Sequence, residues 1–125
     1  DHFLIPVEAA TLSIEPLVTL FQTIEETRDA LNPMLNCAGV LACRLKLGAR
    51  NPFQILRLLH EHFGENLFRH YIRHNVNIAE APAHNTYVAD YMPTSIGAAD
   101  YRRVAEEFEA RLGASHALTP KAANA

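Results

Sequence analysis

Hydrophobic residues along this chain fall into two patterns, short continuous runs and longer stretches with helical spacing. The continuous runs are typical of buried strands, and they lie at residues 3–7, 38–43 and 67–72. The stretches that place an apolar residue every three or four positions predict helices, from residues 14, 52 and 96, with a shorter helix within 77–84. Residues 88–92 fit neither pattern. Because strands and helices alternate, we predict an α/β fold, a parallel sheet with helices on both faces.

Capping and breaking residues set the expected helix ends. The predicted N-terminal caps are Ser13, Asn51 (followed by Pro52) and Ser95. The predicted stops are Pro33, Gly64 and Gly113. The expected inner face of the first helix consists of Ile14, Leu17, Phe21, Ile24 and Leu31. The expected inner face of the last helix consists of Ala98, Tyr101, Ala105, Phe108 and Leu112, and Arg57 and Arg111 are expected to be helix-surface charges.

Composition describes one folded domain and excludes several classes of protein. The 125 residues are 49% hydrophobic and 20% charged, which is the range of globular domains and not of disordered chains. No apolar run reaches the roughly 18–20 residues that cross a bilayer. Cys37 and Cys43 fit neither a disulfide framework nor a zinc-site spacing, so we expect two reduced thiols.

Charge is distributed unevenly along the chain, although the total is only −3. Residues 44–73 hold six Lys or Arg and two Glu, a net charge of +4, which leaves −7 for the rest. Ligands of parallel α/β sheets bind beyond the carboxyl ends of the strands. Two of the predicted strands are followed by residues 44–46 and 73–75 of this basic stretch. We therefore expect an anion-binding surface on that rim of the sheet.

Several short segments, in a fixed order, resemble one protein family. They are residues 1–7 (DHFLIPV), 39–41 (GVL), 72–76 (IRHNV) with Glu80-Ala81, and 93–101 (PTSIGAADY). Together they resemble the C-terminal half of a ParA/Soj-type partition ATPase, a branch of the ParA/MinD superfamily. The resemblance covers residues 1–112, and the small and polar residues 113–125 are expected to form a flexible tail.

This resemblance implies the C-terminal part of a doubly wound, P-loop NTPase-like domain of the deviant Walker type. It implies ATP and Mg²⁺ as cofactors, a nucleotide-sandwich dimer, non-specific DNA binding in the ATP state, and a ParB-like partner protein. The intact protein would be an ATP-dependent DNA-binding switch for plasmid or chromosome segregation, cytoplasmic and associated with the nucleoid when it binds DNA. The alternative is a non-catalytic interaction or dimerisation module.

By the same resemblance, the adenosine end of the nucleotide rests on the loops after two late strands. The residues implied are Arg44, Arg73, His74 and Asn75. An arginine can stack on adenine, and an asparagine can pair with the edge of the base. The alternative is that Asn75 only caps the following short helix and that Arg73 is solvated. His74 stands where the family frequently has arginine, so a charged contact there depends on pH.

Contacts with the phosphates of DNA would use cations near the same rim. The residues expected to make them are Lys46, Arg50, Arg69, Arg73, Arg102 and Arg103. Binding of this kind is electrostatic and weakens steeply with salt. Lys46 stands where the family frequently has an acidic residue. A solvated charged face is the alternative for each of these side chains.

Patterns for catalysis and metal binding are not found in the sequence. A phosphate-binding loop needs glycines and a lysine that reaches the phosphates, but Lys46 and Lys121 are the only lysines and neither lies in such a loop. We therefore expect that this chain alone does not hydrolyse ATP, and no catalytic residue is assigned. The histidine pairs, two and four residues apart, do not share a face, so no metal site is predicted.

The chain begins with Asp1, directly in a predicted strand, so we expect a fragment of a larger protein. An edge strand without its neighbour exposes unpaired N–H and C=O groups. We therefore expect self-association into a homo-oligomer through that edge, or marginal stability. Membrane attachment is not expected, because the last helix carries Glu106, Glu107 and Glu109 in place of a basic amphipathic surface.

Overall fold

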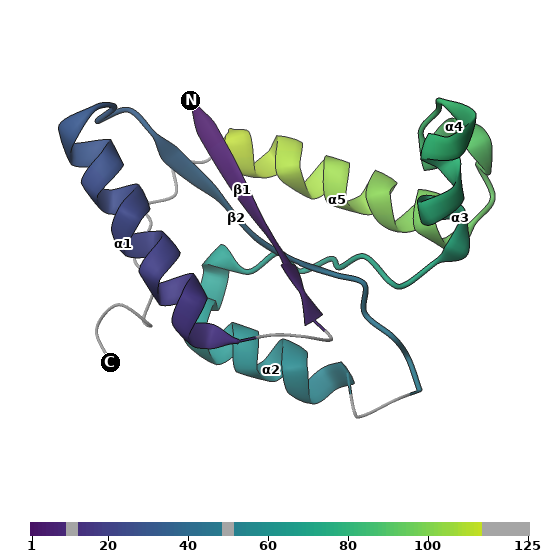
Figure 1. Ribbon diagram of the computed structural model, residues 1–125, viewed down its shortest axis with the longest axis horizontal. Helices are drawn as coiled ribbons and strands as arrows, with labels where there is room; N and C mark the ends of the chain where they lie inside the picture. The colour runs from purple at the N-terminus through teal and green to yellow at the C-terminus, as the bar shows by residue number, and fades with distance from the viewer. Residues whose placement is uncertain (10–12, 49–51, 114–125) are drawn as a thin grey trace.

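Two parallel strands form the sheet of this protein, whose computed structural model describes residues 1–9, 13–48 and 52–113. The strands are β1 (His2–Glu8) and β2 (Asn36–Cys43), and helix α1 (Ile14–Ala30) lies between them in the sequence (Figure 1). In their register, Ile5 stands beside Val40. The first two predicted strands and the first predicted helix are therefore confirmed.

Helical elements make up most of the described chain after β2. They are α2 (Pro52–Phe63), η2 (Gly64–Asn66), α3 (Val76–Glu80), η3 (Ala81–His84), α4 (Val88–Tyr91) and α5 (Ile96–Leu112). The predicted helices from residues 52 and 96 and the short helix within 77–84 are confirmed. The undecided segment at 88–92 contains the short helix α4.

The predicted helix ends mostly agree with the structure. The Ser95 side chain accepts a hydrogen bond from the backbone N–H of Ala98 at 3.1 Å, and Gly64 adopts a φ of +52° where α2 ends. Ser13 is the N-cap residue of α1, whereas the predicted cap Asn51 lies outside the described residues. Leu31, predicted to face inward, is 80% exposed because α1 ends one residue earlier.

Helices cover both faces of the sheet, as the sequence predicts (Figure 1). On one face, Phe21 of α1 and Leu59 of α2 pack in a buried cluster with Val40 of β2. On the other face, Val104 of α5 belongs to a buried cluster with Leu41 of β2. Neighbouring residues of β2 thus anchor helices on opposite faces. The described chain is an α/β fold built on a two-stranded parallel sheet.

A bulge in β2 lets the following segment pack directly on the sheet. The register with β1 shifts between Phe3 and Leu4, and Gly39 of β2 adopts a φ of +145°. A Cβ at Gly39 would lie 2.6 Å from the backbone oxygen of Asn66 and 2.7 Å from the ring of Phe68. Glycine is required here both for the backbone conformation and for the close approach.

The prediction of a third strand at residues 67–72 is wrong. Residues 67–73 run beside β2 in the parallel direction. Among the described residues they make two isolated bridges with the β2 side of the sheet, Val40 with Leu67 and Leu45 with Arg73. Between these bridges the backbone N–H groups of Phe68 and Ile72 donate to the carbonyls of Val40 and Ala42 in β2. The N–H groups of Arg69 and His70 donate instead to Glu107 of α5, and the ladder with β2 is interrupted there.

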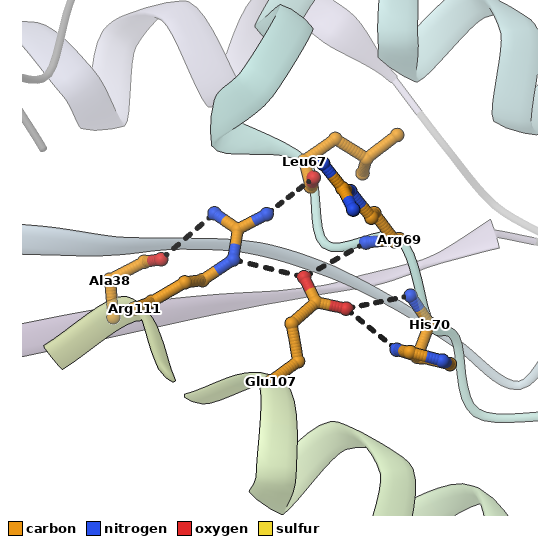
Figure 2. A network of polar contacts seen from close by, with 6 residues as sticks. All are labelled: Ala38, Leu67, Arg69, His70, Glu107 and Arg111. Carbon is orange, nitrogen blue, oxygen red and sulfur yellow. Dashed lines mark hydrogen bonds and ion pairs between the residues drawn. The ribbon is translucent and has the colours of Figure 1, made fainter. Parts of the chain in front are cut away.

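Glu107 of α5 binds the backbone between the two bridges (Figure 2). Its carboxylate accepts hydrogen bonds from the backbone N–H groups of Arg69 and His70, each at 3.0 Å. The same carboxylate contacts Nδ1 of His70 at 2.8 Å. The Glu107 side chain is 12% exposed, so these groups are bound largely away from water.

Arg111 is not the surface charge that the sequence predicts. Its side chain is 10% exposed, and its guanidinium lies 4.3 Å from the centre of the Phe68 ring. It donates to the carbonyl oxygens of Leu67 at 2.8 Å and Ala38 at 3.2 Å (Figure 2). Its Nε donates to Glu107 at 2.9 Å. Arg111 therefore connects β2, the 67–73 segment and α5.

The buried face of α5 differs in part from the predicted one. Ala98 and Phe108 pack inward as predicted. Tyr101, Ala105 and Leu112, expected to face inward, are exposed. The buried or mostly buried positions that contact residues 67–73 are Asp100, Val104, Glu107 and Arg111. Apolar spacing fails here because three of these four side chains are charged. They are buried through ion pairs and backbone hydrogen bonds.

The C-terminal tail lies outside the described residues apart from Gly113, the C-cap of α5. Within the described residues, each helix is too short or too polar to cross a membrane.

Removal of the Glu107 side chain is expected to destabilise the fold strongly. Glu107→Ala leaves the buried Arg111 without its counter-charge and two backbone N–H groups without an acceptor, which costs about 3 kcal/mol. Glu109→Ala, on the exposed side of the same helix, should change the free energy of unfolding by less than about 0.5 kcal/mol. Urea titration followed by circular dichroism measures both. Equal losses in the two variants would contradict this role of Glu107.

The stability that Glu107 provides is expected to depend on pH. Burial raises the pKa of Glu107, but hydrogen bonds from the backbone of Arg69 and His70 and from the side chains of His70 and Arg111 outweigh it, so the pKa is lowered. Because the folded pKa lies below the unfolded value of 4.5, the stabilisation is present above that pH and is lost as pH falls through the folded pKa. The difference in unfolding free energy between the natural chain and Glu107→Gln should therefore shrink between about pH 7 and pH 3. A difference in unfolding free energy that stays constant over this range would argue against stabilisation by the ionised Glu107 carboxylate.

Candidate functional site

The carboxyl end of β2 and the end of the 67–73 segment meet at one rim of the sheet. The backbone N–H of Leu45 donates to Ile72 at 3.1 Å, and the N–H of His74 donates back to Leu45 at 3.0 Å. Leu45 itself is 1% exposed and anchors this junction. The two loops that the sequence singles out, 44–46 and 73–75, are therefore held side by side.

A hollow of about 340 Å³, the rim hollow, lies between these loops. It is lined by the four predicted nucleotide-binding residues, Arg44, Arg73, His74 and Asn75. Ile78 of α3 and Tyr101 of α5 provide apolar surface beside them. The structure thus brings together all four residues that were assigned to the adenosine end of a nucleotide.

Three of these residues, among them Asn75 and Arg44, already have side-chain partners within the chain. Oδ1 of Asn75 accepts the backbone N–H of Asn77 at 3.0 Å and so caps α3, which agrees with the alternative stated for Asn75. Its side-chain amide nitrogen is not used in this cap. Arg44, which adopts a φ of +54°, forms an ion pair with Glu8 at 3.3 Å. Both side chains of this pair are largely exposed, so the pair contributes little to stability.

Arg73 is held by a buried carboxylate and is not simply solvated. Its backbone N–H and its Nε donate to Oδ2 of Asp100 at 3.0 Å each, and its Nη2 donates to Oδ1 at 2.8 Å. The Asp100 side chain is 4% exposed, and Arg103 lies 3.5 Å from it. Burial raises the pKa of Asp100, but the hydrogen bonds and charge of Arg73, with the charge of Arg103, outweigh it and lower the pKa. The same hydrogen bonds raise the pKa of Arg73.

Sequence reasoning did not assign a role to Asp100. A signal was present, because Asp100 stands four residues before the apolar Val104 and seven before Glu107, on one face of the helix. An acidic residue at such a position is buried when a cation pairs with it.

A second hollow of about 330 Å³, the cationic hollow, adjoins the first. It is lined by Arg69, His70, Tyr71, Arg73, Asp100 and Arg103. Three of the predicted DNA-binding arginines therefore line one hollow, and two of them, Arg73 and Arg103, pair with Asp100. Arg73 lines both hollows and connects them.

The other predicted DNA-binding residues are placed differently. Lys46 lines a neighbouring hollow of about 360 Å³ with Arg73 and His74. Arg102 does not line the cationic hollow, and its guanidinium donates to the carbonyl of Pro93 at 2.9 Å. Arg50 lies outside the described residues. The cations that the structure gathers are therefore fewer than the sequence suggested.

Metal ligands and reactive thiols are not found at this rim within the described residues. No group of three or more His, Cys, Asp or Glu side chains in this part of the chain stands close enough to hold a metal ion. Cys43 lines the rim hollow, and burial raises its pKa. Burial also raises the pKa of Cys37 to about 11. The thiols are therefore protonated at neutral pH.

Comparison with known proteins finds several relatives that are named as chromosome-partitioning proteins. No protein-family profile matches the chain. It is 39% identical over 112 residues to the chromosome-partitioning ATPase Soj of Thermus thermophilus. The aligned residues make up 90% of this chain and 45% of that protein. It is 30% identical over 110 residues to the sporulation initiation inhibitor protein Soj of Bacillus subtilis, covering 88% of this chain and 44% of the relative.

A third relative is the chromosome partitioning protein ParA of Caulobacter vibrioides, 29% identical over 111 residues, with 89% of this chain and 42% of that protein covered. The chain therefore spans less than half of the length of these relatives. The aligned region covers about nine-tenths of this chain. This extent agrees with the resemblance over residues 1–112 that the sequence indicated. The chain is of the ParA/Soj type and corresponds to part of such a protein.

Proposed function

We propose that this chain supplies the adenosine-side loops and a DNA-binding face of a ParA-type chromosome-partitioning ATPase. The intact protein would be an ATP-dependent DNA-binding switch that acts on the nucleoid with a ParB-like partner and as a dimer. The observation that carries this proposal is the shared rim: the rim hollow and the cationic hollow adjoin and have Arg73 in common. The names of the Soj and ParA relatives support chromosome partition as the process.

The rim hollow suits an adenine base better than a phosphate group. A base is flat and apolar on its faces. Ile78 and Tyr101 offer apolar surface in this hollow, and Arg44 of the same lining can stack its guanidinium plane on the base. The unused amide nitrogen of Asn75 can donate to a ring nitrogen of the base. When bound, ATP with Mg²⁺ would supply the cleavable phosphoanhydride. The chain contains no glycine-rich loop with a lysine for the phosphates, so we assign it no hydrolytic step.

The cationic hollow suits the phosphate backbone of DNA. Arg69, Arg73 and Arg103 line this hollow with one carboxylate, Asp100, which leaves an excess of positive charge. Because Asp100 binds Nε and Nη2 of Arg73, the guanidinium is held in one orientation. Its third nitrogen, Nη1, can then donate a hydrogen bond to a phosphate. Contacts of this kind position a protein on DNA without reading its sequence.

Nucleotide binding is tested by a substitution that keeps the helix cap. Asn75→Asp retains an oxygen for the N–H of Asn77 but removes the amide donor. We expect the affinity for an ATP analogue carrying a fluorescent group on the ribose to fall about tenfold, the effect of one lost hydrogen bond to a buried partner. The midpoint of thermal unfolding should stay unchanged. Unchanged nucleotide affinity, or no binding by the natural chain, would contradict the proposed role of the rim hollow.

DNA binding is tested at Arg69 and Arg103, because Arg73 makes all three hydrogen bonds to the buried Asp100 and its loss would disturb the fold. Arg69→Ala and Arg103→Ala should each weaken binding to a short duplex and reduce the slope of log K against log salt by about 0.9. Arg28→Ala, on α1 away from the rim, is the matched control and should leave both quantities unchanged. Fluorescence anisotropy at several salt concentrations measures them. The same slope in all three variants would count against the cationic hollow as the DNA contact.

A further inference from the structure

A groove of about 890 Å³ runs along the outer side of residues 67–71, between α2 and the C-terminal half of α5. Leu56 of α2, Phe68 and Tyr71 of the segment and Ala110 of α5 give it apolar walls. Its volume lies within the roughly 300–1,000 Å³ of ligand-binding clefts. It is separate from the rim hollow, with which it has no lining residue in common.

The backbone at the base of this groove is already hydrogen-bonded. The carbonyl of Leu67 accepts from Arg111, and the N–H groups of Arg69 and His70 donate to Glu107 (Figure 2). An added β-strand binds mainly through such main-chain groups. Because α5 occupies them, a strand cannot extend the sheet here. An occupant of this groove must bind through side chains.

Charge on the walls of the groove indicates the chemistry of that occupant. The guanidinium groups of Arg57 and Arg69 line the groove, and neither has a hydrogen-bond or ion-pair partner within the described residues. Glu65 is an acidic residue of the same lining without an ion pair in that part of the chain. Glu107 and Arg111 neutralise each other. The remaining excess of positive charge favours carboxylates on the occupant.

We propose that this groove docks an amphipathic α-helix of a partner protein, with an apolar stripe flanked by acidic residues. A helix fits because it satisfies its own backbone and offers side chains at positions i, i+3, i+4 and i+7. The acidic helix of this chain is α1. In a second copy it could not dock here, because its apolar residues Leu17 and Phe21 are buried in that copy's own core. α1 of a second copy is therefore excluded as the occupant.

The test uses designed peptides and the full chain. The probe is a fluorescently labelled peptide of about 18 residues, five helical turns, with Leu at i, i+3, i+4 and i+7 and Glu on both flanks. We expect saturable binding, measured by fluorescence anisotropy, and a gain of helical signal in circular dichroism. Arg57→Glu should weaken binding about tenfold. Arg28→Glu, which makes the same charge change on α1, should leave it within about twofold.

Two further peptides of the same length distinguish the mode of binding. One has Lys in place of each Glu, and the other alternates Val and Thr so that it favours a strand. Both should bind at least about tenfold more weakly than the acidic helix. Equal binding by the strand peptide, equal losses in Arg57→Glu and Arg28→Glu, or no saturable binding of the acidic helix would overturn the proposal. The groove and the cationic hollow share Arg69 and Tyr71 in their linings. The assays contain neither nucleotide nor DNA, and they vary Arg57, which lines only the groove, so the docking proposal can fail while the partition proposal stands, or the reverse.

Discussion

The ion pair between Glu107 and Arg111 holds the last helix against the edge of the sheet, and the rest of the structure depends on that contact. Both side chains are mostly buried. A buried pair of charges is tolerated only when its remaining hydrogen-bonding groups are satisfied. Here the Glu107 carboxylate accepts hydrogen bonds from two backbone N–H groups, and the Arg111 guanidinium donates to two backbone carbonyls. The Glu107 carboxylate therefore accepts backbone N–H groups that carbonyl groups of a neighbouring strand would accept in a wider sheet.

The candidate site depends on the same face of α5. Asp100 lies seven residues before Glu107, which is about two helical turns or 10 Å along the helix. There it fixes the backbone and side chain of Arg73. One helix thus sets the direction of the 67–73 segment at both of its ends, and the rim loops meet as a result. The proposed nucleotide hollow, the proposed DNA contact and the docking groove are all consequences of how α5 is attached.

The sequence predicted the parts of the fold that local patterns determine. Continuous apolar runs identified β1 and β2, and Ser95 and Gly64 marked helix ends correctly. The third strand was wrong because the backbone of Leu67, Arg69 and His70 binds side chains of α5 that lie 37 to 44 residues away in the sequence. No local pattern reports such partners.

The same reasoning explains what was found and missed at the site. The rule that parallel strands end on one rim was enough to bring Arg44 and residues 73–75 together. Asp100 and Arg111 were missed because charged residues in a helix are ordinarily solvated. Only their partners, Arg73 for one and Glu107 with two carbonyls for the other, make burial favourable.

Amide hydrogen exchange of the 67–73 segment tests most directly whether side chains of α5 replace a strand. If they do, the N–H groups of Arg69, His70 and Arg73 exchange as slowly as those of β2, although the segment is not part of a regular ladder. Exchange of these three amides at the rate of the exposed loop residue Leu47 would contradict the account.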